Sequence, residues 1–184
     1  MTKYLVIGSN SFSGQDFIDL LLDDPSREVM GLSRSEPLPR WRLRFMDRPD
    51  LSAYRFFRMD LNRDFDSLED LLRRERPAYV VNFAAQSEVA PSWDAPEDWF
   101  QTNTVALCRL VNFLRQQEWL QRYLHISSPE AYGTTVGVVT EGTPDRPSTP
   151  YAASKAAADM IVSVYQRQFG FPAVSVRSTN VYGA

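Results

Sequence analysis

Short apolar runs alternate along the chain with longer segments in which apolar residues recur at helical spacing. The short runs, rich in Val, Ile, Phe and Tyr, are Tyr4–Ile7, Glu28–Leu32, Tyr54–Met59, Ala78–Phe83, Arg122–Ile126 and Ala173–Val176. The longer segments are Phe12–Leu22, Phe65–Arg74, Glu97–Trp119 and Tyr151–Phe169. Strands that alternate with helices require crossover connections, which build a parallel sheet. The pattern therefore predicts an α/β fold of the Rossmann type, a doubly wound parallel sheet with helices on both faces.

Composition narrows the class of protein. The 184 residues are 43% hydrophobic, enough for the core of one domain. The 20 Lys and Arg against 23 Asp and Glu give a net charge of −3, which argues against nucleic acid or a membrane as a partner. A single cysteine, Cys108, and a single histidine, His125, exclude an intramolecular disulfide and a metal site built from several such ligands. We expect both to be packing residues in a reduced, cytoplasmic protein that binds no metal.

A glycine-containing turn follows the first predicted strand and opens the first helix. It reads Gly8-Ser9-Asn10-Ser11-Phe12-Ser13-Gly14. Backbone amides at a helix N-terminus, with glycines that permit close approach, are typical of a dinucleotide pyrophosphate site. Ser11 replaces the middle glycine of that pattern, so a turn without any ligand is the alternative. Ser9 or Ser11 could donate to a phosphate, and Asn10 tolerates an unusual backbone conformation.

The residues that close the second strand bear on the choice of cofactor. A site for NAD usually places an acid here, whereas this chain has Ser33 and Arg34. A hydroxyl and a guanidinium suit a 2′-phosphate, so we expect NAD(P) with NADP slightly favoured, although Glu36 is near enough to act as the acid. The polar connection from Ser33 to Pro49 is expected to be the most mobile loop.

Tyr151 and Lys155 are four residues apart near the start of a predicted helix and so share one face. A neighbouring ammonium stabilises a phenolate, which lets tyrosine act as a base near neutral pH. Ser127 and Ser128, at the end of the fifth strand, offer a hydroxyl that holds a substrate oxygen. An exposed helix pair with no catalytic role is the alternative interpretation.

Together these residues resemble the extended short-chain dehydrogenase/reductase family, in its nucleotide-sugar epimerase/dehydratase branch. The resemblance runs through the whole chain, and it also includes Asp60-Leu61, the segment Asn82–Gln86, Asn103 and the segment Asn180–Gly183. It implies that residues 1–184 are an NAD(P)-binding Rossmann domain. The cofactor contacts that it implies are Gly8, Ser9, Asn10, Ser11, Phe12, Gly14, Ser33, Arg34, Asp60, Leu61, Phe83, Ala84, Ala85, Gln86, Asn103, Ser127, Tyr151, Lys155 and Asn180.

Within this branch the segments Ala84–Ser87 and Ile126–Gly133 look most like the sugar-nucleotide 4,6-dehydratases. The resemblance implies hydride removal from C4, proton removal from C5 and loss of water from C6. It implies the catalytic residues Ser128, Glu130, Tyr151 and Lys155, with Glu130 as the base for C5. Pro129 stands where many dehydratases have a proton donor, so a 4-epimerase is the first alternative. A non-catalytic NAD(P)-binding module is the second.

The resemblance also implies that the family continues beyond Ala184 into a smaller substrate domain. We therefore expect the N-terminal part of a longer enzyme, with a nucleotide sugar as the substrate of the whole protein and little turnover by this chain alone. The helices Glu97–Trp119 and Tyr151–Phe169 are the expected contact of a homodimer.

Overall fold

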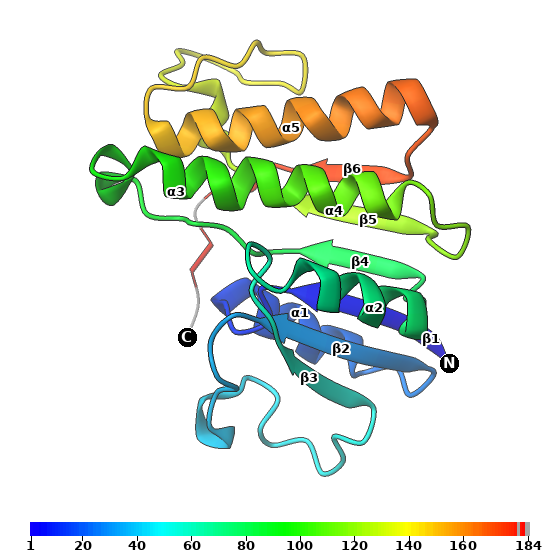
Figure 1. Ribbon diagram of the computed structural model, residues 1–184. Coiled ribbons are helices and arrows are strands. Elements are labelled where there is room, and N and C mark those ends of the chain that lie inside the picture. Colours follow the sequence, from blue (N-terminus) through cyan, green and yellow to red (C-terminus); the bar gives the residue numbers. More distant parts are fainter. Residues whose placement is uncertain (180, 183–184) are drawn as a thin grey trace. The chain divides into compact units, whose positions relative to one another are not determined.

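The computed structural model of the protein describes residues 1–179 and 181–182. The strands are β1 (Thr2–Ile7), β2 (Arg27–Ser33), β3 (Tyr54–Arg58), β4 (Tyr79–Asn82), β5 (Arg122–Ile126) and β6 (Ala173–Val176), hydrogen-bonded in the order β3-β2-β1-β4-β5-β6. The helices are α1 (Phe12–Leu21), α2 (Phe65–Glu75), α3 (Pro96–Phe100), α4 (Leu107–Leu114) and α5 (Pro150–Phe169) (Figure 1). The Rossmann-type α/β fold is confirmed, and every predicted strand is within two residues of its observed bounds.

Strand β1 marks the point where the strand order reverses. It pairs in parallel with β2 on one side and with β4 on the other. Open α/β sheets bind ligands beyond the carboxyl ends of the strands at such a switch point. Because Ile7 and Asn82 are register partners, the turn after β1 and the segment after β4 leave the sheet side by side.

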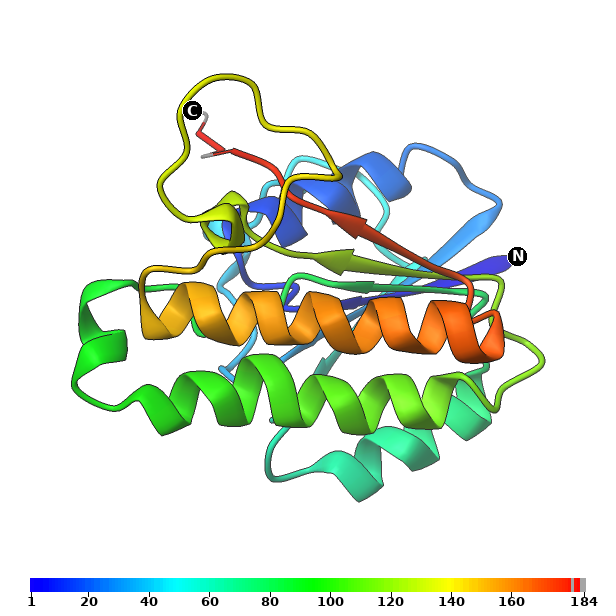
Figure 2. The ribbon, with the colours of Figure 1, turned by 90° about the horizontal axis from the view of Figure 1, so that it is seen from above.

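The chain divides into two compact units. Unit 1 contains Met1–Ala84 and Gln116–His125, and unit 2 contains Ala85–Arg115 and Ile126–Ala184. In unit 1, α1 and α2 lie on opposite faces of the strands (Figures 1 and 2). Val6, Ile18 and Val29 are fully buried in a core cluster beneath α1. This arrangement covers both sides of the central strands, which explains why β1 and β2 are apolar on successive residues.

The connection from Ser33 to Pro49 is anchored to the rest of unit 1 at two points, Phe45 and Arg48. Phe45 is 1% exposed and belongs to the same core cluster as Val6. Arg48 donates to Asp19 Oδ1 and Asp23 Oδ1 of α1 and the turn after it, both at 2.6 Å. The sequence did not reveal these anchors, because Phe45 lies in a short segment, Trp41–Met46, whose apolar and charged residues show no sustained helical or strand periodicity.

The predicted helix Glu97–Trp119 of unit 2 is wrong in two respects. A π-helical segment, Gln101–Ala106, separates α3 from α4, and the helix ends at Leu114, before Trp119. Within the π-helical segment, Asn103 and Thr104 turn toward α5 and donate to the Ser154 hydroxyl and the Ser154 carbonyl oxygen, each at 2.9 Å. Such contacts to a distant helix override local helical hydrogen bonding, and π-helical turns are frequent at functional sites.

Helix α5 begins and ends as the sequence predicts. The Thr149 hydroxyl caps it by accepting from the Ala152 amide at 3.1 Å, Pro150 occupies its first position, and Gly170 follows it in the left-handed region. These local signals agree with the observed bounds of α5. Helices α4 and α5 lie side by side in unit 2 (Figures 1 and 2).

The single histidine and the single cysteine differ in burial. His125 is 1% exposed and stacks against Tyr123, as expected of a packing residue. Cys108 is half-buried rather than buried in the core, because the apolar stripe of α4 runs through Leu107, Leu110 and Val111 and leaves Cys108 at its edge.

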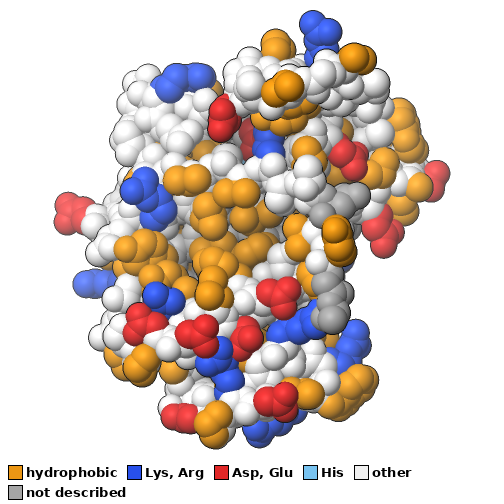
Figure 3. Space-filling model, turned by 180° about the vertical axis from the view of Figure 1, so that it is seen from behind, with side chains coloured by type: hydrophobic (Ala, Val, Ile, Leu, Met, Phe, Trp, Pro, Cys, Tyr) orange, Lys and Arg blue, Asp and Glu red, His pale blue; other side chains and the backbone are white. Residues whose placement is uncertain are grey.

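Some apolar surface stays uncovered in the described part of the chain. Val174 and Val176 of β6 are exposed and point to the same side, since alternate residues of a strand share a face. Figure 3 shows hydrophobic side chains gathered on the face opposite to the one in Figure 1. Among the described residues, no helix combines the length and the apolar character needed to cross a membrane.

Candidate functional site

The turn after β1, in unit 1, requires glycine at its first position. Gly8 has φ +81°, and a Cβ there would lie 2.6 Å from the Ala84 amide nitrogen. The backbones of the turn and of the segment after β4 therefore approach each other more closely than a side chain allows. The Gly8 amide donates to Leu32 O at 2.7 Å, which ties the turn to β2 as well.

Ser11 replaces the middle glycine without obstructing the turn. Its hydroxyl accepts from the Gly14 amide at 3.1 Å and so caps α1. A Cβ on Gly14 would lie 2.5 Å from Gly8 O, so the third glycine permits the helix to begin directly against the turn. The side chain of Ser11 is thus directed into the first turn of α1, where serine is a favourable N-cap.

The buried hydroxyls of Ser9 and Ser33 hold the turn to the end of β2. The two serines are 2% and 7% exposed, and their hydroxyl oxygens are 3.3 Å apart. Ser33 Oγ also accepts from the Asn10 amide at 3.0 Å. These hydroxyls fix the turn to the end of β2, and the predicted contacts Gly8, Ser9, Asn10, Ser11, Gly14 and Ser33 lie together in unit 1.

The charged residues after β2 lie at the surface of unit 1. Arg34 is exposed, and Glu36 forms an ion pair with Arg58 at the end of β3. The Asn10 side chain donates to Ser35 Oγ and to Glu36 O, both at 2.9 Å. Glu36, considered from the sequence as an acid for a ribose hydroxyl, is thus directed toward a cation of the neighbouring strand.

The segments after β3 and β4 have their own fixed geometry. The Asp60 carboxylate accepts from the Asn62 amide at 2.8 Å, and Leu61 is buried. Asn82 accepts from the Ala84 amide at 3.0 Å, while Phe83 packs against Phe17. Asn82 is 2% exposed, so its amide serves to shape the strand end beside Gly8.

In unit 2, a chain of hydrogen bonds connects Gln86 to the start of α5. Asn103 accepts from the Gln86 amide at 2.8 Å and donates to Gln86 O at 3.0 Å. It also donates to Ser154 Oγ, which in turn donates to Tyr151 O at 2.7 Å. Asn103 is 3% exposed, and the π-helical turn that carries it therefore fixes both the segment after Ala85 and the helix that carries Tyr151.

Tyr151, Ser128 and Glu130 come together in unit 2. Ser128 caps a short 3-10 helix, Pro129–Tyr132, by accepting from the Glu130 amide at 3.3 Å. Burial raises the pKa of the Tyr151 phenol, a hydrogen bond with Ser128 opposes that rise, and the nearby Glu130 carboxylate adds to it. The phenol is therefore neutral in the resting protein, in contact with the hydroxyl that the sequence assigned as its partner.

Lys155 lies one helical turn further along α5 and is 3% exposed. Its ammonium donates to Ile126 O, at the end of β5, at 2.7 Å. Burial lowers the pKa of Lys155 to about 8, and the negative charge of Asp159 opposes that decrease. Burial is also the main cause of the raised pKa of Tyr151, and the Lys155 ammonium donates to a carbonyl oxygen. That Lys155 brings the phenol into range for base catalysis stays a prediction.

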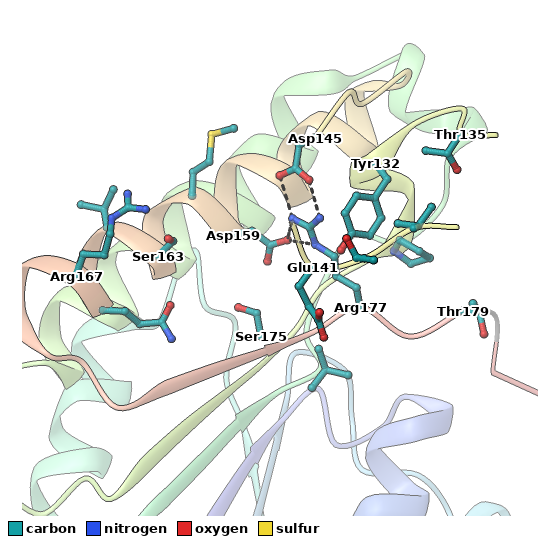
Figure 4. Close-up of a pocket in the computed structure, with 17 residues that line it drawn as sticks. Tyr132, Thr135, Glu141, Asp145, Asp159, Ser163, Arg167, Ser175, Arg177 and Thr179 are labelled. Carbon is teal, nitrogen blue, oxygen red and sulfur yellow. Dashed lines mark hydrogen bonds and ion pairs between the residues drawn. The ribbon is translucent and has the colours of Figure 1, made fainter. Parts of the chain in front are cut away.

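Sequence reasoning missed three charged residues beside this group. Arg177, which follows β6, forms ion pairs with Asp159 of α5 and with Asp145 of the loop before α5. These pairs lie on the wall of an open pocket in unit 2 (Figure 4). Ser127, expected to contact cofactor, instead donates its hydroxyl to Asp159 Oδ2 at 2.7 Å. The spacing of four residues from Lys155 to Asp159 was the available signal. Asn180, also expected to contact cofactor, lies outside the described residues.

These two residue groups fit a dinucleotide and a hydroxyl-bearing substrate by their chemistry. In unit 1, a tight glycine turn with positive φ opens a helix whose N-terminus favours an anion. In unit 2, a buried phenol, hydroxyl and ammonium, with the exposed Glu130 carboxylate nearby, offer a proton acceptor, a hydrogen-bond partner and a positive charge. This combination suits oxidation of an alcohol, in which a proton leaves the oxygen as hydride leaves the carbon.

Comparison with known proteins gives consistent matches. A family model described as GDP-mannose 4,6 dehydratase matches residues 5–184. A dTDP-glucose 4,6-dehydratase from Xanthomonas campestris pv. campestris is 31% identical over 194 residues, which cover 100% of this chain and 54% of the relative.

Solved structures match the fold along nearly the whole chain. UDP-glucose 4-epimerase from Thermus thermophilus, in complex with NAD, has a TM-score of 0.85 and 32% identity, and the match covers 99% of this chain and 56% of that one. UDP-glucuronic acid 4-epimerase from Bacillus cereus, in complex with UDP-glucuronic acid and NAD, has a TM-score of 0.86 and 26% identity, over 99% and 58%. The chain thus spans little more than half the length of these relatives.

The glycine turn yields a stability prediction with a matched control. Gly8 and Gly137 have φ +81° and +87°, but a Cβ on Gly137 would meet nothing within 4 Å. Gly137→Ala should cost about 1 kcal/mol, from its backbone conformation alone. Gly8→Ala adds the collision with the Ala84 amide and should cost about 3 kcal/mol or more. Urea unfolding of both variants measures the difference, and equal losses would show that the close approach at Gly8 is absent.

Proposed function

Because the chain belongs to the GDP-mannose 4,6 dehydratase family, we propose that it is the cofactor-binding part of a nucleotide-sugar 4,6-dehydratase. The observation that carries the proposal is the buried group in unit 2, where Tyr151 contacts Ser128 beside Glu130 and Lys155 follows one turn later. The relative from Xanthomonas campestris is a dTDP-glucose 4,6-dehydratase, which makes a nucleoside-diphosphate hexose the proposed substrate class.

The glycine turn would hold the diphosphate of a nicotinamide dinucleotide. Gly8 and Gly14 allow the turn to pack closely against the segment after β4 and against the start of α1, and the Ser11 hydroxyl caps the helix. A dinucleotide bound there would provide the acceptor for the hydride that leaves C4 and the donor of the hydride that completes the reaction. The two solved relatives named above are NAD complexes, which supports a nicotinamide cofactor.

Tyr151 acts on the C4 hydroxyl of the substrate. Ser128 holds that hydroxyl, and the phenolate form of Tyr151 takes its proton. Burial keeps the phenol protonated in the resting protein, so the phenolate needs a positive charge close by. With a pKa of about 8, Lys155 is mostly an ammonium at neutral pH and supplies that charge.

Glu130 takes the C5 proton once C4 is a ketone, because the carbonyl acidifies the adjacent C–H bond. Its amide is held by Ser128, so the carboxylate is carried on the same short turn as the hydroxyl that orients the substrate. Pro129 offers no proton to the leaving C6 hydroxyl, which therefore takes its proton from water or another residue.

A nucleotide-sugar 4-epimerase is the second candidate. It needs only Ser128, Tyr151, Lys155 and the cofactor, and it needs no donor at Pro129. Both solved relatives named above are 4-epimerases, which supports this alternative. A non-catalytic dinucleotide-binding module is disfavoured, because it would not require a lysine buried beside a tyrosine in contact with a serine.

NADP is the proposed form of the cofactor. The Arg34 guanidinium lies at the surface beyond β2, and the nearby acid, Glu36, is paired with Arg58. Exposed ion pairs of this kind are weak, and a 2′-phosphate carries more charge than a carboxylate. We also propose a homodimer through α4, the π-helical segment before it and α5, supported by exposed Val105, Met160 and Val164.

Arg34 is expected to discriminate between the two dinucleotides. Arg34→Ala should weaken NADP binding about tenfold and leave NAD binding within about twofold, whereas Glu36→Gln should tighten NADP. Arg73→Ala is the control, because Arg73 is an equally surface-placed arginine in an ion pair on α2. Calorimetric titration with each dinucleotide at two salt concentrations measures the ratio. Tighter NAD than NADP binding by the unaltered chain would contradict the NADP preference.

Replacement of Glu130 is expected to distinguish a dehydratase from an epimerase. In the protein extended to the length of its relatives, Glu130→Gln should slow loss of water from a nucleoside-diphosphate hexose at least about a hundredfold and spare oxidation at C4. Glu141→Gln, an exposed carboxylate of the same unit, is the control. Mass spectrometry of the products detects the loss of water, and NMR detects inversion at C4. Inversion without loss of water in the unaltered protein would favour the epimerase.

A further inference from the structure

Tyr151, Lys155 and Asp159 form one stripe along α5. They are spaced by four residues, so they follow one another on a single helix face, and all three are at most 9% exposed. The proposed function uses the first two. Asp159 has no assigned role, yet a carboxylate is rarely buried unless it has partners.

Asp159 binds the segment that carries the catalytic serine. Its Oδ2 atom accepts from Ser127 Oγ at 2.7 Å. The Ser127 amide donates to Val176 O at 2.8 Å, and the preceding carbonyl, Ile126 O, accepts from Lys155 at 2.7 Å. Three hydrogen bonds therefore fix residues 126–127, and the next residue is Ser128, the partner of Tyr151.

Arg177 holds Asp159 in this position. Its guanidinium donates from Nε to Asp159 Oδ2 at 2.8 Å, and its other two nitrogens bind the two oxygens of Asp145 at 2.6 and 2.9 Å. It also lies 4.4 Å from the ring centroid of Tyr132, in the turn that carries Glu130. Figure 4 shows Asp145 and Asp159 directed at Arg177 from the loop and from α5, with Tyr132 beside them.

The charges of this cluster favour a positive neighbour. Two carboxylates share one guanidinium, so Asp159, Asp145 and Arg177 together carry one negative charge. The charged groups that bear on this part of α5 are Asp159, which acts on Lys155, Arg177, which is bound to Asp159, and Glu130, which acts on Tyr151. Among them, Asp159 is the one whose charge acts directly on Lys155.

We propose that Asp159, held by Arg177, is a positioning residue for the acid–base group: it fixes Ser127, and through it Ser128, and it places a negative charge one helical turn from Lys155. The proposal rests on the proposed function, because it assigns Asp159 a task only if Tyr151 and Lys155 act on a substrate. A purely structural role predicts a loss of stability and nothing else.

The chain has a convenient reporter for this proposal, since Lys3 and Lys155 are its only lysines. In protein labelled with 13C-lysine, Lys155→Met identifies the Lys155 signal, and its titration gives the pKa directly. Asp159→Asn should lower the pKa of Lys155 by about 1 from its value of about 8, because an attractive charge is removed. Asp159→Glu, which keeps the charge, should restore most of the difference.

Asp145→Asn is the matched control. It removes a carboxylate from the same guanidinium but touches neither Ser127 nor Lys155 in the contacts described, so it should lower the melting temperature and leave the pKa of Lys155 unchanged. An equal change of the Lys155 pKa in the Asp145 and Asp159 variants, or none in either, would overturn the proposal.

Ser127→Ala tests the positioning step without removing a charge, and it provides a readout if Asp159→Asn does not fold. Loss of the Ser127 hydroxyl should loosen Ser128 and raise the pKa of Tyr151, because the Ser128 hydrogen bond lowers it. The Tyr151 signal is followed in 13C-tyrosine protein and assigned with Tyr151→Phe. An unchanged Tyr151 pKa would contradict the positioning step.

Both titrations are made without dinucleotide, so they fail independently of the proposed function. If Lys155 and Tyr151 respond as expected but neither NAD nor NADP binds, the coupling of Asp159 to these two residues is confirmed and the enzymatic proposal fails. If dinucleotide binds and the pKa of Lys155 is the same with and without the Asp159 carboxylate, the enzymatic proposal stands and the positioning role fails.

Discussion

A buried ammonium group is the constraint on which the acid–base part of this molecule depends. Lys155 is 3% exposed, and a charge in that position persists only with compensating partners. Ile126 O, at the end of β5, accepts a hydrogen bond from Lys155 at 2.7 Å, and Asp159 provides negative charge one helical turn away. Lys155 thus binds Ile126 and Asp159 binds Ser127, so the contacts that compensate the charge of Lys155 also fix the serine that contacts Tyr151.

The glycine turn after β1 depends on a different constraint, the close approach of two backbones at the ends of β1 and β4. Parallel pairing in register brings Gly8 beside Ala84, and a Cβ at Gly8 would lie 2.6 Å from the Ala84 amide. The turn stays narrow because Ser9, Ser33 and Asn82 hold it through buried hydrogen bonds. Serine at position 11 is compatible with this geometry, since it faces the helix as its cap.

Much of this arrangement could be predicted from the sequence, because the signals are local. Thr149, Pro150 and Gly170 set the bounds of α5, and the apolar runs set the strands. The spacing of Tyr151 and Lys155, with Ser128 after a strand, was enough to place the acid–base group. Each of these features depends on residues within a few positions of one another or on the order of elements along the chain.

The features that could not be predicted depend on partners far apart in the sequence. The π-helical turn arises where Asn103 bonds Ser154, 51 residues later, and Phe45 is buried by residues of β1, α1 and β2. Arg177 reaches Asp145 and Asp159 across 32 and 18 residues. The pKa of Tyr151 also escaped prediction, because it is set by burial, which the spacing of Tyr151 and Lys155 does not reveal.

The central claim is that the chain binds a nicotinamide dinucleotide whose reactive end is met by the Tyr151–Lys155 group. Its most direct test is titration of NADP into protein labelled with 13C-lysine, because Lys3 of β1 serves as an internal control for Lys155. The account predicts saturable binding that shifts the Lys155 signal and leaves the Lys3 signal in place. The absence of binding by both NADP and NAD, or binding that leaves the Lys155 signal unchanged, would contradict this claim.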